Sequence, residues 1–330
     1  MKLFKQLTQI ILIWSIICVD FHILTVVMNI KKDVCKMSNL KDKKTMYTAP
    51  PFKEQTQAWP GISSKMDPIP DHGESTYVGN GKLKGRKALI TGGDSGIGRA
   101  VAIAYAREGA DVAISYHPDE ESDAREVKTI IEDSGQKCVL LAGDIRNPQW
   151  CNLLVELAAS KLEGIDILVN NAARQKSVSK LTDLTDEDFE WTVKTNVYAP
   201  FWITKNVLNY MKSGSTIINT ASVVAFDPSP DLKDYAMTKA ALLNFTKSLA
   251  KEVIDQGIRV NAVAPGPVWT PLQISGGQTK ADYQQFGASS LFKRPGQPAE
   301  LAHIYVYLAS NDSSFVTAET YGITGGKILF

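Results

Sequence analysis

The sequence predicts an α/β fold built on one doubly wound parallel sheet. From residue 82 onward, strand-like and helix-like segments alternate, and the strand-like segments are apolar throughout. A glycine-rich turn at residues 91–98 (TGGDSGIG) joins the first apolar run to the first helix-like run. Strand, glycine turn and helix in this order are typical of a dinucleotide-binding unit. The predicted fold is therefore of the Rossmann type, with helices on both faces of the sheet.

The elements of this fold are expected in alternating order along the chain. Strands are predicted at residues 87–90, 111–116, 137–142, 166–169, 216–220, 259–263 and 320–324. Helices are predicted at residues 99–105, 119–134, 147–162, 187–211, 235–254 and 298–309, the fourth as one long helix that carries Asn196. No second domain is needed, so residues 85–330 are predicted to form a single dinucleotide-binding catalytic domain.

The glycine turn suits a phosphate group. Gly92, Gly96 and Gly98 let the backbone turn sharply and approach a pyrophosphate without a Cβ in the way. The helix that follows directs its free N–H groups and its positive dipole end at the phosphates. The alternative is an ordinary glycine-rich turn between a strand and a helix, and the downstream segments decide between the two.

Residues 1–36 form an apolar leader that precedes the predicted domain. Asp20 and His22 interrupt its apolar run. Three interpretations remain open: an internal start at Met37, a membrane anchor through residues 10–28, and a cleaved signal peptide. An acidic residue near the centre of a membrane span costs about 2.5–3.5 kcal/mol on insertion scales, and no small-residue cleavage site is evident.

Residues 37–84 are predicted to form an extended, proline-rich arm. Five prolines lie between residues 50 and 70, and few apolar positions recur with a regular period. Proline fixes φ and removes a backbone donor, which disfavours helix and sheet here. Phe52, Trp59 and Tyr77 are expected to hold the arm on the main body. A disordered leader is the alternative.

The composition excludes several classes of function. Lys and Arg total 36 against 35 acidic residues, so no net field favours nucleic acid. The four cysteines and four histidines show no metal-ligand spacing, so no metal is expected. Reduced thiols are typical of a cytoplasmic protein, which is the expected location.

Tyr235 and Lys239 are the decisive pair for chemistry. Four residues apart on a predicted helix, they share one face, so an ammonium lies beside a phenol. A nearby positive charge is expected to lower the tyrosine pKa from about 10 toward neutral pH. Such a tyrosine gives a proton to a carbonyl or takes one from an alcohol. Ser222 ends a predicted strand at the sheet edge where ligands bind in such folds, whereas the alternative for the pair alone is a solvated helix face.

Taken together, these segments resemble the short-chain dehydrogenase/reductase family of the classical type. The matching segments are TGGDSGIG (91–98), Gly143-Asp144, NNAA (170–173), Asn196, Ser222, YAMTK (235–239) and PGPVWT (265–270). The proline-rich arm, the TGGDSGIG variant and the LQISGGQT stretch resemble a bacterial subgroup of oxidoreductases similar to glucose/ribitol dehydrogenases and general stress proteins. Chains of that subgroup begin near Met37, which favours the internal start.

The resemblance implies a role for each residue of a catalytic tetrad. Tyr235 is the expected general acid/base, and Lys239 is expected also to hold the nicotinamide ribose. Ser222 is expected to position the substrate oxygen, and Asn196 to hold a water for a proton relay. For Asn196 the alternative is a helix-interior asparagine that satisfies backbone groups.

The resemblance also implies a set of cofactor contacts. Asp144 is expected to bind the adenine, Asn170 and Ala172 to line the adenosine side, and Asp94 to organise the turn through backbone hydrogen bonds. Ala173 departs from the usual glycine, but its methyl group is small. The expected cofactor-binding residues are Gly92, Asp94, Ser95, Gly96, Ile97, Gly98, Ser115, Tyr116, Asp144, Ile145, Asn171, Ala172, Ala173, Tyr235, Lys239, Pro265, Gly266, Val268 and Thr270.

The choice between NAD and NADP is weakly encoded. NAD enzymes carry an acidic residue at the end of the second strand, where Ser115, Tyr116 and His117 lie. NADP needs basic donors for its 2′-phosphate, and Ser95 occupies the position where related enzymes place one. Neither signature is met, and the expectation is NAD or NADP with NAD favoured.

The expected function is interconversion of an alcohol and a carbonyl by hydride transfer with NAD(P). Ser222, Tyr235 and Gln273 are the predicted substrate contacts, and uncharged polar residues between 270 and 294 suit a polyol or sugar. The alternative is a catalytically silent, cofactor-sensing or structural stress protein on the same fold. Enoyl reductases of this fold space the tyrosine and lysine more widely, which disfavours that chemistry. The family usually forms tetramers, so a homotetramer is expected.

Overall fold

The computed structural model of the protein describes residues 41–327. Contacts divide the chain into two compact units, residues 1–46 and 47–330, and the sheet and most of the arm belong to the second. The predicted leader at residues 1–36 lies outside the described residues. Within residues 41–327, no helix combines the length and the apolar character needed to cross a membrane.

The sheet contains seven parallel strands in the order β3-β2-β1-β4-β5-β6-β7. The order reverses direction between β1 and β4, which opens a crevice at the carboxyl ends of these strands. The predicted doubly wound parallel sheet is confirmed. The strands are β1 (Lys87–Thr91), β2 (Asp111–Tyr116), β3 (Cys138–Ala142), β4 (Ile167–Asn170), β5 (Thr216–Thr220), β6 (Arg259–Pro265) and β7 (Thr320–Ile323).

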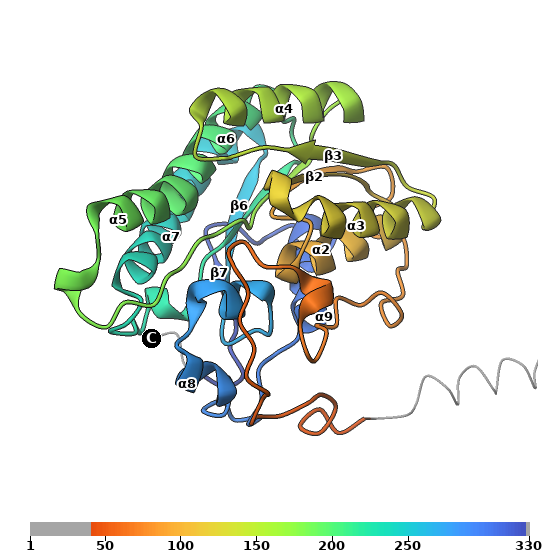
Figure 1. Ribbon diagram of the computed structural model, residues 1–330. Coiled ribbons are helices and arrows are strands. Elements are labelled where there is room, and N and C mark those ends of the chain that lie inside the picture. Colours follow the sequence, from red (N-terminus) through yellow and green to blue (C-terminus); the bar gives the residue numbers. More distant parts are fainter. Residues whose placement is uncertain (1–40, 328–330) are drawn as a thin grey trace, which may run out of the picture. The chain divides into compact units, whose positions relative to one another are not determined.

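Helices cover both faces of this sheet (Figure 1). One layer contains α2 (Gly96–Arg107), α3 (Glu121–Asp133) and α9 (Pro298–Ala309). The other contains α4 (Pro148–Leu162), α6 (Ala199–Val207) and α7 (Lys233–Val253), with α5 (Asp186–Val193) beside α7 and the short α8 (Lys280–Gln284) near the cavity described below.

The apolar strand sequences follow from this two-sided covering. Ile90 and Ile114 point into the core under α2 and α9, whereas Leu89 and Leu168 point into the core under α4 and α6. All four side chains are fully buried. Because both faces are covered, the five strands from β2 to β6 in the sheet order are buried apart from some first residues, and the alternation seen in half-buried strands is absent from them, whereas the edge strands β3 and β7 are partly exposed.

The helix predicted at residues 187–211 is observed as one helical run over residues 186–207 that contains a π-helical turn. The structure has α5 up to Val193, then a π-helical turn at Lys194–Tyr198, and then α6. Pro200, at the start of α6, has no N–H to donate, so the regular ladder is interrupted one turn earlier, where Asn196 lies. The other predicted strands and helices are observed with ends shifted by a few residues.

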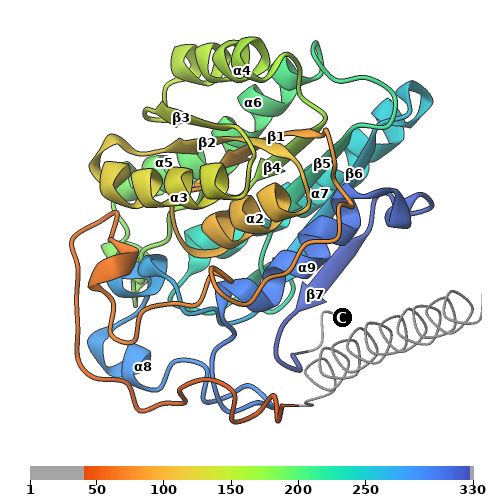
Figure 2. The ribbon, with the colours of Figure 1, turned by 90° about the vertical axis from the view of Figure 1, so that its right-hand side faces the viewer.

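The described arm is extended and packed on the main body (Figure 2). Phe52 is buried and stacks on Trp269 of the loop after β6, with ring centroids 4.2 Å apart. The Tyr77 hydroxyl donates to Glu108 at the end of α2 at 2.7 Å. Trp59 packs edge-on against Trp191 of α5. Side chains from the arm thus reach elements on both sides of the crevice.

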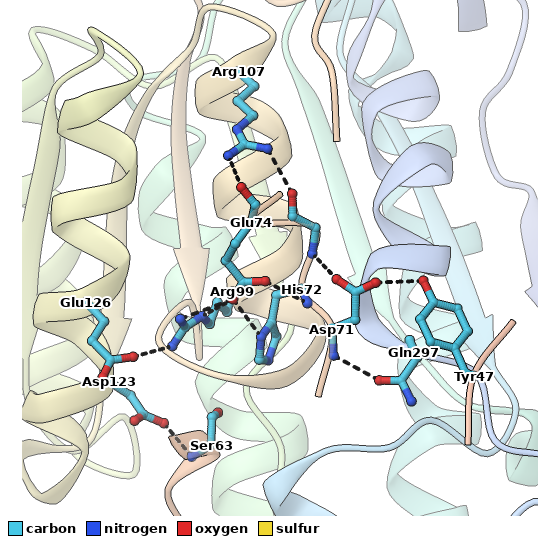
Figure 3. A network of polar contacts seen from close by, with 11 residues as sticks. Tyr47, Ser63, Asp71, His72, Glu74, Arg99, Arg107, Asp123, Glu126 and Gln297 are labelled. Atoms are coloured by element: carbon cyan, nitrogen blue, oxygen red, sulfur yellow. Dashed lines mark hydrogen bonds and ion pairs between the residues drawn. The ribbon is translucent and has the colours of Figure 1, made fainter. Parts of the chain in front are cut away.

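Polar contacts hold the same arm to the outer helices (Figure 3). Glu74 pairs with Arg99 of α2 at 3.1 Å, and Arg107 of α2 donates to three arm carbonyl oxygens, those of Gly73, Glu74 and Tyr77. The Ser63 N–H donates to Asp123 of α3 at 2.7 Å. These contacts give the backbone of the arm the partners that a sheet would otherwise supply.

Candidate active site

A cavity of about 600 Å³ lies at the carboxyl ends of the strands. Its size suits a small-molecule or cofactor ligand. Predicted site residues that line this one cavity are Gly92, Asp94, Ser95, Gly96, Ile97, Ser115, Tyr116, Asp144, Ile145, Asn171, Ala172, Ala173, Ser222, Tyr235, Lys239, Pro265, Gly266, Val268, Thr270 and Gln273. Gly98 and Asn196 do not line it.

The glycine turn between β1 and α2 forms the floor at one end. Gly92 has φ +62°, a conformation that favours glycine. A Cβ at Gly98 would lie 1.8 Å from the Gly92 carbonyl oxygen, so Gly98 serves the close packing of the turn and not the cavity wall. Ser95 makes no side-chain cap to α2, which leaves N–H groups of the first turn for an anion. This cradle fits the pyrophosphate of a dinucleotide.

Hydrogen bonds fasten the glycine turn to the end of β4. The Thr91 hydroxyl accepts from the N–H groups of Asn171 and Ala172 at 3.0 and 3.1 Å. In return, the Asn171 side chain donates to the carbonyl oxygens of Thr91 and Gly92 at 3.2 and 3.1 Å. The two sides of the crevice are therefore held at a fixed separation.

Two predictions for the adenosine side require correction. Asn170 faces the interior, where its amide donates to Thr204 and Asn219, because it is the last residue of a strand buried on both faces. Asp94 was expected to brace the turn, but its buried carboxyl oxygens receive no hydrogen bond of good geometry. Its nearest polar groups are its own amide, the Ser95 hydroxyl and the Glu120 carboxyl.

At the other end, Tyr235 and Lys239 lie one turn apart on α7. The Lys239 ammonium lies 5.4 Å from the Tyr235 ring centroid and donates to the Thr220 carbonyl oxygen at 2.7 Å. Ser222, just after β5, forms a side-chain hydrogen bond with Tyr235. The three side chains are buried and line the same part of the cavity. The strand end and the helix face therefore converge as the sequence spacing predicts.

The predicted lowering of the tyrosine pKa is wrong for this arrangement. Burial raises the pKa of Tyr235 to about 12, and the hydrogen bond with Ser222 offsets this only in part. Burial also lowers the pKa of Lys239 to about 7. Loss of water disfavours the charged form of each group, and this cost outweighs the attraction between phenolate and ammonium. The phenol therefore holds its proton at neutral pH.

Asn196 lies behind the cavity wall in the π-helical turn. The side-chain oxygen of Asn196 accepts from the backbone N–H of Arg174 at 2.8 Å. The side-chain amide of Asn196 donates to the backbone carbonyl oxygen of Arg174 and to the Thr238 hydroxyl. Both amide hydrogens are thus committed to protein partners, so the side chain does not donate to a water in the cavity. The alternative assignment, an asparagine that satisfies backbone groups, matches this geometry.

Sequence reasoning missed the aromatic and charged groups that close the adenosine end. Trp59 from the arm lies edge-on to His117, 4.8 Å between ring centroids, and both line the cavity. Arg146 pairs with Asp144 through two hydrogen bonds and stacks 4.3 Å over Trp191. Arg146 is visible two residues after Asp144 in the sequence. Trp59 was expected to hold the arm on the main body, but nothing local in the sequence indicates its place in the cavity wall, because its partners are distant in the chain.

Amide side chains gather around Gln273, the predicted substrate contact. The Gln273 side-chain oxygen accepts from Gln175 at 3.2 Å and from Gln278 at 3.3 Å, and all three residues line the cavity. Among residues 41–327 no group of three or more His, Cys, Asp or Glu side chains is arranged to hold a metal ion.

Comparison with known proteins agrees with this geometry. The family model described as Enoyl-(Acyl carrier protein) reductase matches residues 92–327. The chain is 56% identical over 293 residues to the Uncharacterized oxidoreductase YghA of Escherichia coli (strain K12), covering 89% of this chain and 100% of that protein. It is 41% identical over 285 residues to the Glucose and ribitol dehydrogenase of Daucus carota, covering 85% and 97%.

A similar solved structure is a short chain dehydrogenase from Burkholderia cenocepacia J2315 in complex with NADP. It has a TM-score of 0.69 and 32% identity, and the match covers 74% of this chain and 98% of that one. The match to this structure therefore covers less of the present chain than the matches to the Escherichia coli and Daucus carota proteins do. Fold, cavity and relatives agree, and this chain belongs to the short-chain dehydrogenase/reductase family of oxidoreductases.

Proposed function

We propose that the protein interconverts an alcohol and a carbonyl by hydride transfer with a nicotinamide dinucleotide. The observation that carries this proposal is the convergence of Tyr235, Ser222 and Lys239 on a cavity that begins at the glycine turn. A proton donor, an orienting hydroxyl and a cation are the groups that this reaction needs beside the cofactor.

The cofactor's fit is supported by the glycine cradle and the uncapped N-terminus of α2. The turn at Gly92–Gly98 would hold the pyrophosphate, and Pro265, Gly266, Val268 and Thr270 would contact the nicotinamide end. When bound, the dinucleotide supplies or accepts the hydride. Either NAD or NADP meets this requirement. The tight turn approaches the phosphates by backbone alone, so affinity does not depend on a basic side chain there.

The charge state of the site favours the direction of carbonyl reduction. Tyr235, with its pKa raised to about 12, is protonated at neutral pH and donates its proton to the carbonyl oxygen. Ser222 holds that oxygen beside the phenol. Alcohol oxidation requires the phenol as its conjugate base, so the oxidation rate should increase with pH through the alkaline range.

We also propose a polyol or sugar-like substrate. The amides of Gln175, Gln273 and Gln278 form an uncharged polar rim that suits hydroxyl groups. The name of the Daucus carota relative, Glucose and ribitol dehydrogenase, supports the same class. An acyl thioester would bring a long apolar chain, for which this rim offers no partner.

The test is a panel of polyols, sugars, aldehydes and one enoyl thioester, with absorbance of the reduced nicotinamide as the readout. Tyr235→Phe should reduce turnover at least about 1,000-fold while cofactor affinity stays within about twofold. Tyr210→Phe, an exposed tyrosine outside the cavity, is the matched control and should change neither quantity. Retained turnover in Tyr235→Phe would refute the mechanism. Tight cofactor binding with no turnover on the panel would favour the silent, cofactor-sensing alternative.

The assembly and location are proposed on separate grounds. Large apolar side chains remain exposed along this part of the chain: Phe189 on α5, Tyr198 in the π-helical turn, Phe201 on α6 and Met237 on α7. Burial of such a surface between copies of the chain would stabilise a homotetramer. Light scattering of the purified chain tests the tetramer. A cytoplasmic location, where the cofactor pool lies, is tested by cell fractionation.

A further inference from the structure

Residues 57–63 of the arm are anchored at both ends beside the cavity. At the start, the Gln57 N–H donates to the carbonyl oxygen of Ile274, which follows β6, at 3.3 Å. At the end, the Ser63 N–H donates to Asp123 of α3 at 2.7 Å (Figure 3). Trp59 lies between these anchors and lines the cavity. The arm is therefore attached to two separate parts of the main body on either side of Trp59.

The tip of this segment, Trp59–Gly61, is held in place by a clamp and by a close contact. The Gln57 side chain accepts from the Ile62 N–H at 2.7 Å and donates to the Ile62 carbonyl oxygen at 3.1 Å, which closes a loop around the tip. A Cβ at Gly61 would lie 3.1 Å from the Pro271 Cβ, so the tip sits tightly against the loop after β6. The clamped loop therefore presents Trp59 to the cavity in a preorganised position.

The Trp59 ring joins the two sides of the crevice. Its centroid lies 4.8 Å from that of His117, which follows β2, and 5.1 Å from that of Trp191 on α5. Both contacts are edge-on, and all three side chains line the cavity. Trp59 is partly exposed, so part of its ring surface is available to a ligand in the cavity.

The adenosine of a bound dinucleotide would lie at this end of the cavity. A pyrophosphate on the glycine turn directs the adenosine toward the carboxyl ends of β2 and β3. His117 directly follows β2, Asp144 closely follows β3, and both line the cavity together with Trp59. Every nucleic-acid base has a π-face that stacks on aromatic side chains. The Trp59 ring therefore suits the adenosine part of the cofactor.

We infer that the arm completes the cofactor site: Trp59 covers the adenosine of the bound dinucleotide, and the cofactor leaves only after the tip withdraws. The inference rests on the proposed function, because it requires a dinucleotide on the glycine turn. The family model begins at residue 92, after the arm, so this contact lies outside the part of the chain that the model describes. The arm then sets how long the cofactor stays bound.

The test measures dissociation of the reduced nucleotide from the purified full chain by stopped-flow displacement, with nucleotide fluorescence as the readout and no substrate present. The nucleotide is NADH or NADPH, whichever the unaltered chain binds more tightly. Trp59→Ala should accelerate dissociation by about 10-fold, because the aromatic contact with the base is lost. Trp59→Phe keeps an aromatic ring, and its rate should stay within about threefold of that of the unaltered chain.

A second variant loosens the tip without changing a residue of the cavity wall. Gln57→Ala removes both hydrogen bonds of the clamp, and Gln57 does not line the cavity. This variant should accelerate dissociation at least about threefold, because the tip withdraws more often. Val78→Ala is the matched control, since Val78 is an exposed residue of the same arm that does not line the cavity. Its dissociation rate should change by less than about twofold.

A fragment of the cofactor shows which part Trp59 contacts. ADP-ribose contains the adenosine and the pyrophosphate but lacks the nicotinamide. Trp59→Ala should weaken binding of ADP-ribose and of the dinucleotide by the same factor, about 10-fold, since the lost contact is with the part that both share. A loss of affinity for the dinucleotide that ADP-ribose does not share would overturn the inference.

The remaining outcomes separate this inference from the function on which it rests. Dissociation from Trp59→Ala within about twofold of the unaltered rate would overturn the inference, as would an unchanged rate in Gln57→Ala. Binding of neither NADH nor NADPH by the unaltered chain would overturn the proposed function itself. Thermal unfolding shows whether each variant is folded. Gln57→Ala leaves Trp59 in place and tests the same release step if Trp59→Ala does not fold.

Discussion

Truncating Phe52 to alanine should release the arm without unfolding the sheet. Phe52 is 5% exposed and stacks on the fully buried Trp269, inside a small cluster with Met66, Ile274 and Tyr283. Loss of a buried phenylalanine costs about 3–5 kcal/mol, and this cluster is peripheral enough to relax, so we expect about 3 kcal/mol. The cost falls on the local opening of the arm, because the main cores contain no Phe52 contact.

Limited proteolysis measures this opening directly. A loss of about 3 kcal/mol raises the population of the open arm on the order of 100-fold, and cleavage within residues 47–84 should accelerate by the same factor when reclosing is fast. Val78→Ala, at an exposed position of the same arm, should leave cleavage unchanged. An acceleration below about fivefold for Phe52→Ala would show that the stacked ring does not hold the arm, and would refute the reasoning.

Three further predictions test other parts of the structure. Gly98→Ala should destabilise the fold by about 3 kcal/mol in urea titrations and abolish nucleotide binding, since its Cβ would lie 1.8 Å from the Gly92 carbonyl oxygen; unchanged binding would contradict the tight turn. Burial raises the pKa of Cys138 and Cys151 to about 12, so both thiols are protonated at pH 8 in the folded chain. Alkylation at pH 8 should therefore be at least about 100-fold slower in the folded chain than in urea. Peptide mass spectrometry measures the two rates. Burial alone would raise the pKa of Glu74, but hydrogen bonds and charges from His72 and Arg99 hold it at about 2. The Glu74 carboxylate therefore stabilises the fold fully above about pH 4.5. The loss of stability caused by Glu74→Gln should become smaller as the pH falls from about 4.5 toward 2, as measured by urea unfolding at each pH. A deficit that is constant across this range would show that the carboxylate charge is not involved.

The sheet and its crevice could be predicted because their signals are local. Apolar strands, the glycine turn and the spacing of Tyr235 and Lys239 each depend on neighbours within a few residues. The π-helical turn before Pro200 was also predictable in principle, since a proline inside a predicted helix removes a donor. It was overlooked because the apolar period continues across it.

Groups whose environment is set by distant segments could not be predicted from the pattern. The pKa of Tyr235 depends on how completely α7, β5 and the loops exclude water, which no motif encodes. The side chain of Asn196 does not line the cavity, because its amide donates to the Arg174 carbonyl oxygen and the Thr238 hydroxyl. Glu120 closely follows the predicted second strand in the sequence. Its contact with Asp94 could not be predicted, because it forms only when two turns that are distant in the chain lie together in the fold.

The arm has a consequence for the order in which the molecule matures. Some of its partners lie early in the chain, such as Arg99 of α2 and Asp123 of α3, whereas Trp269 and Gln297 are made late, so the docking of the arm is complete only when the start of α9 exists. Trp59 and Pro60 line the cavity and belong to the arm, so they take their places in the cavity wall when the arm docks. The part of the cavity wall that Trp59 and Pro60 form is therefore completed late in synthesis, and a dinucleotide that binds there would stabilise the finished form.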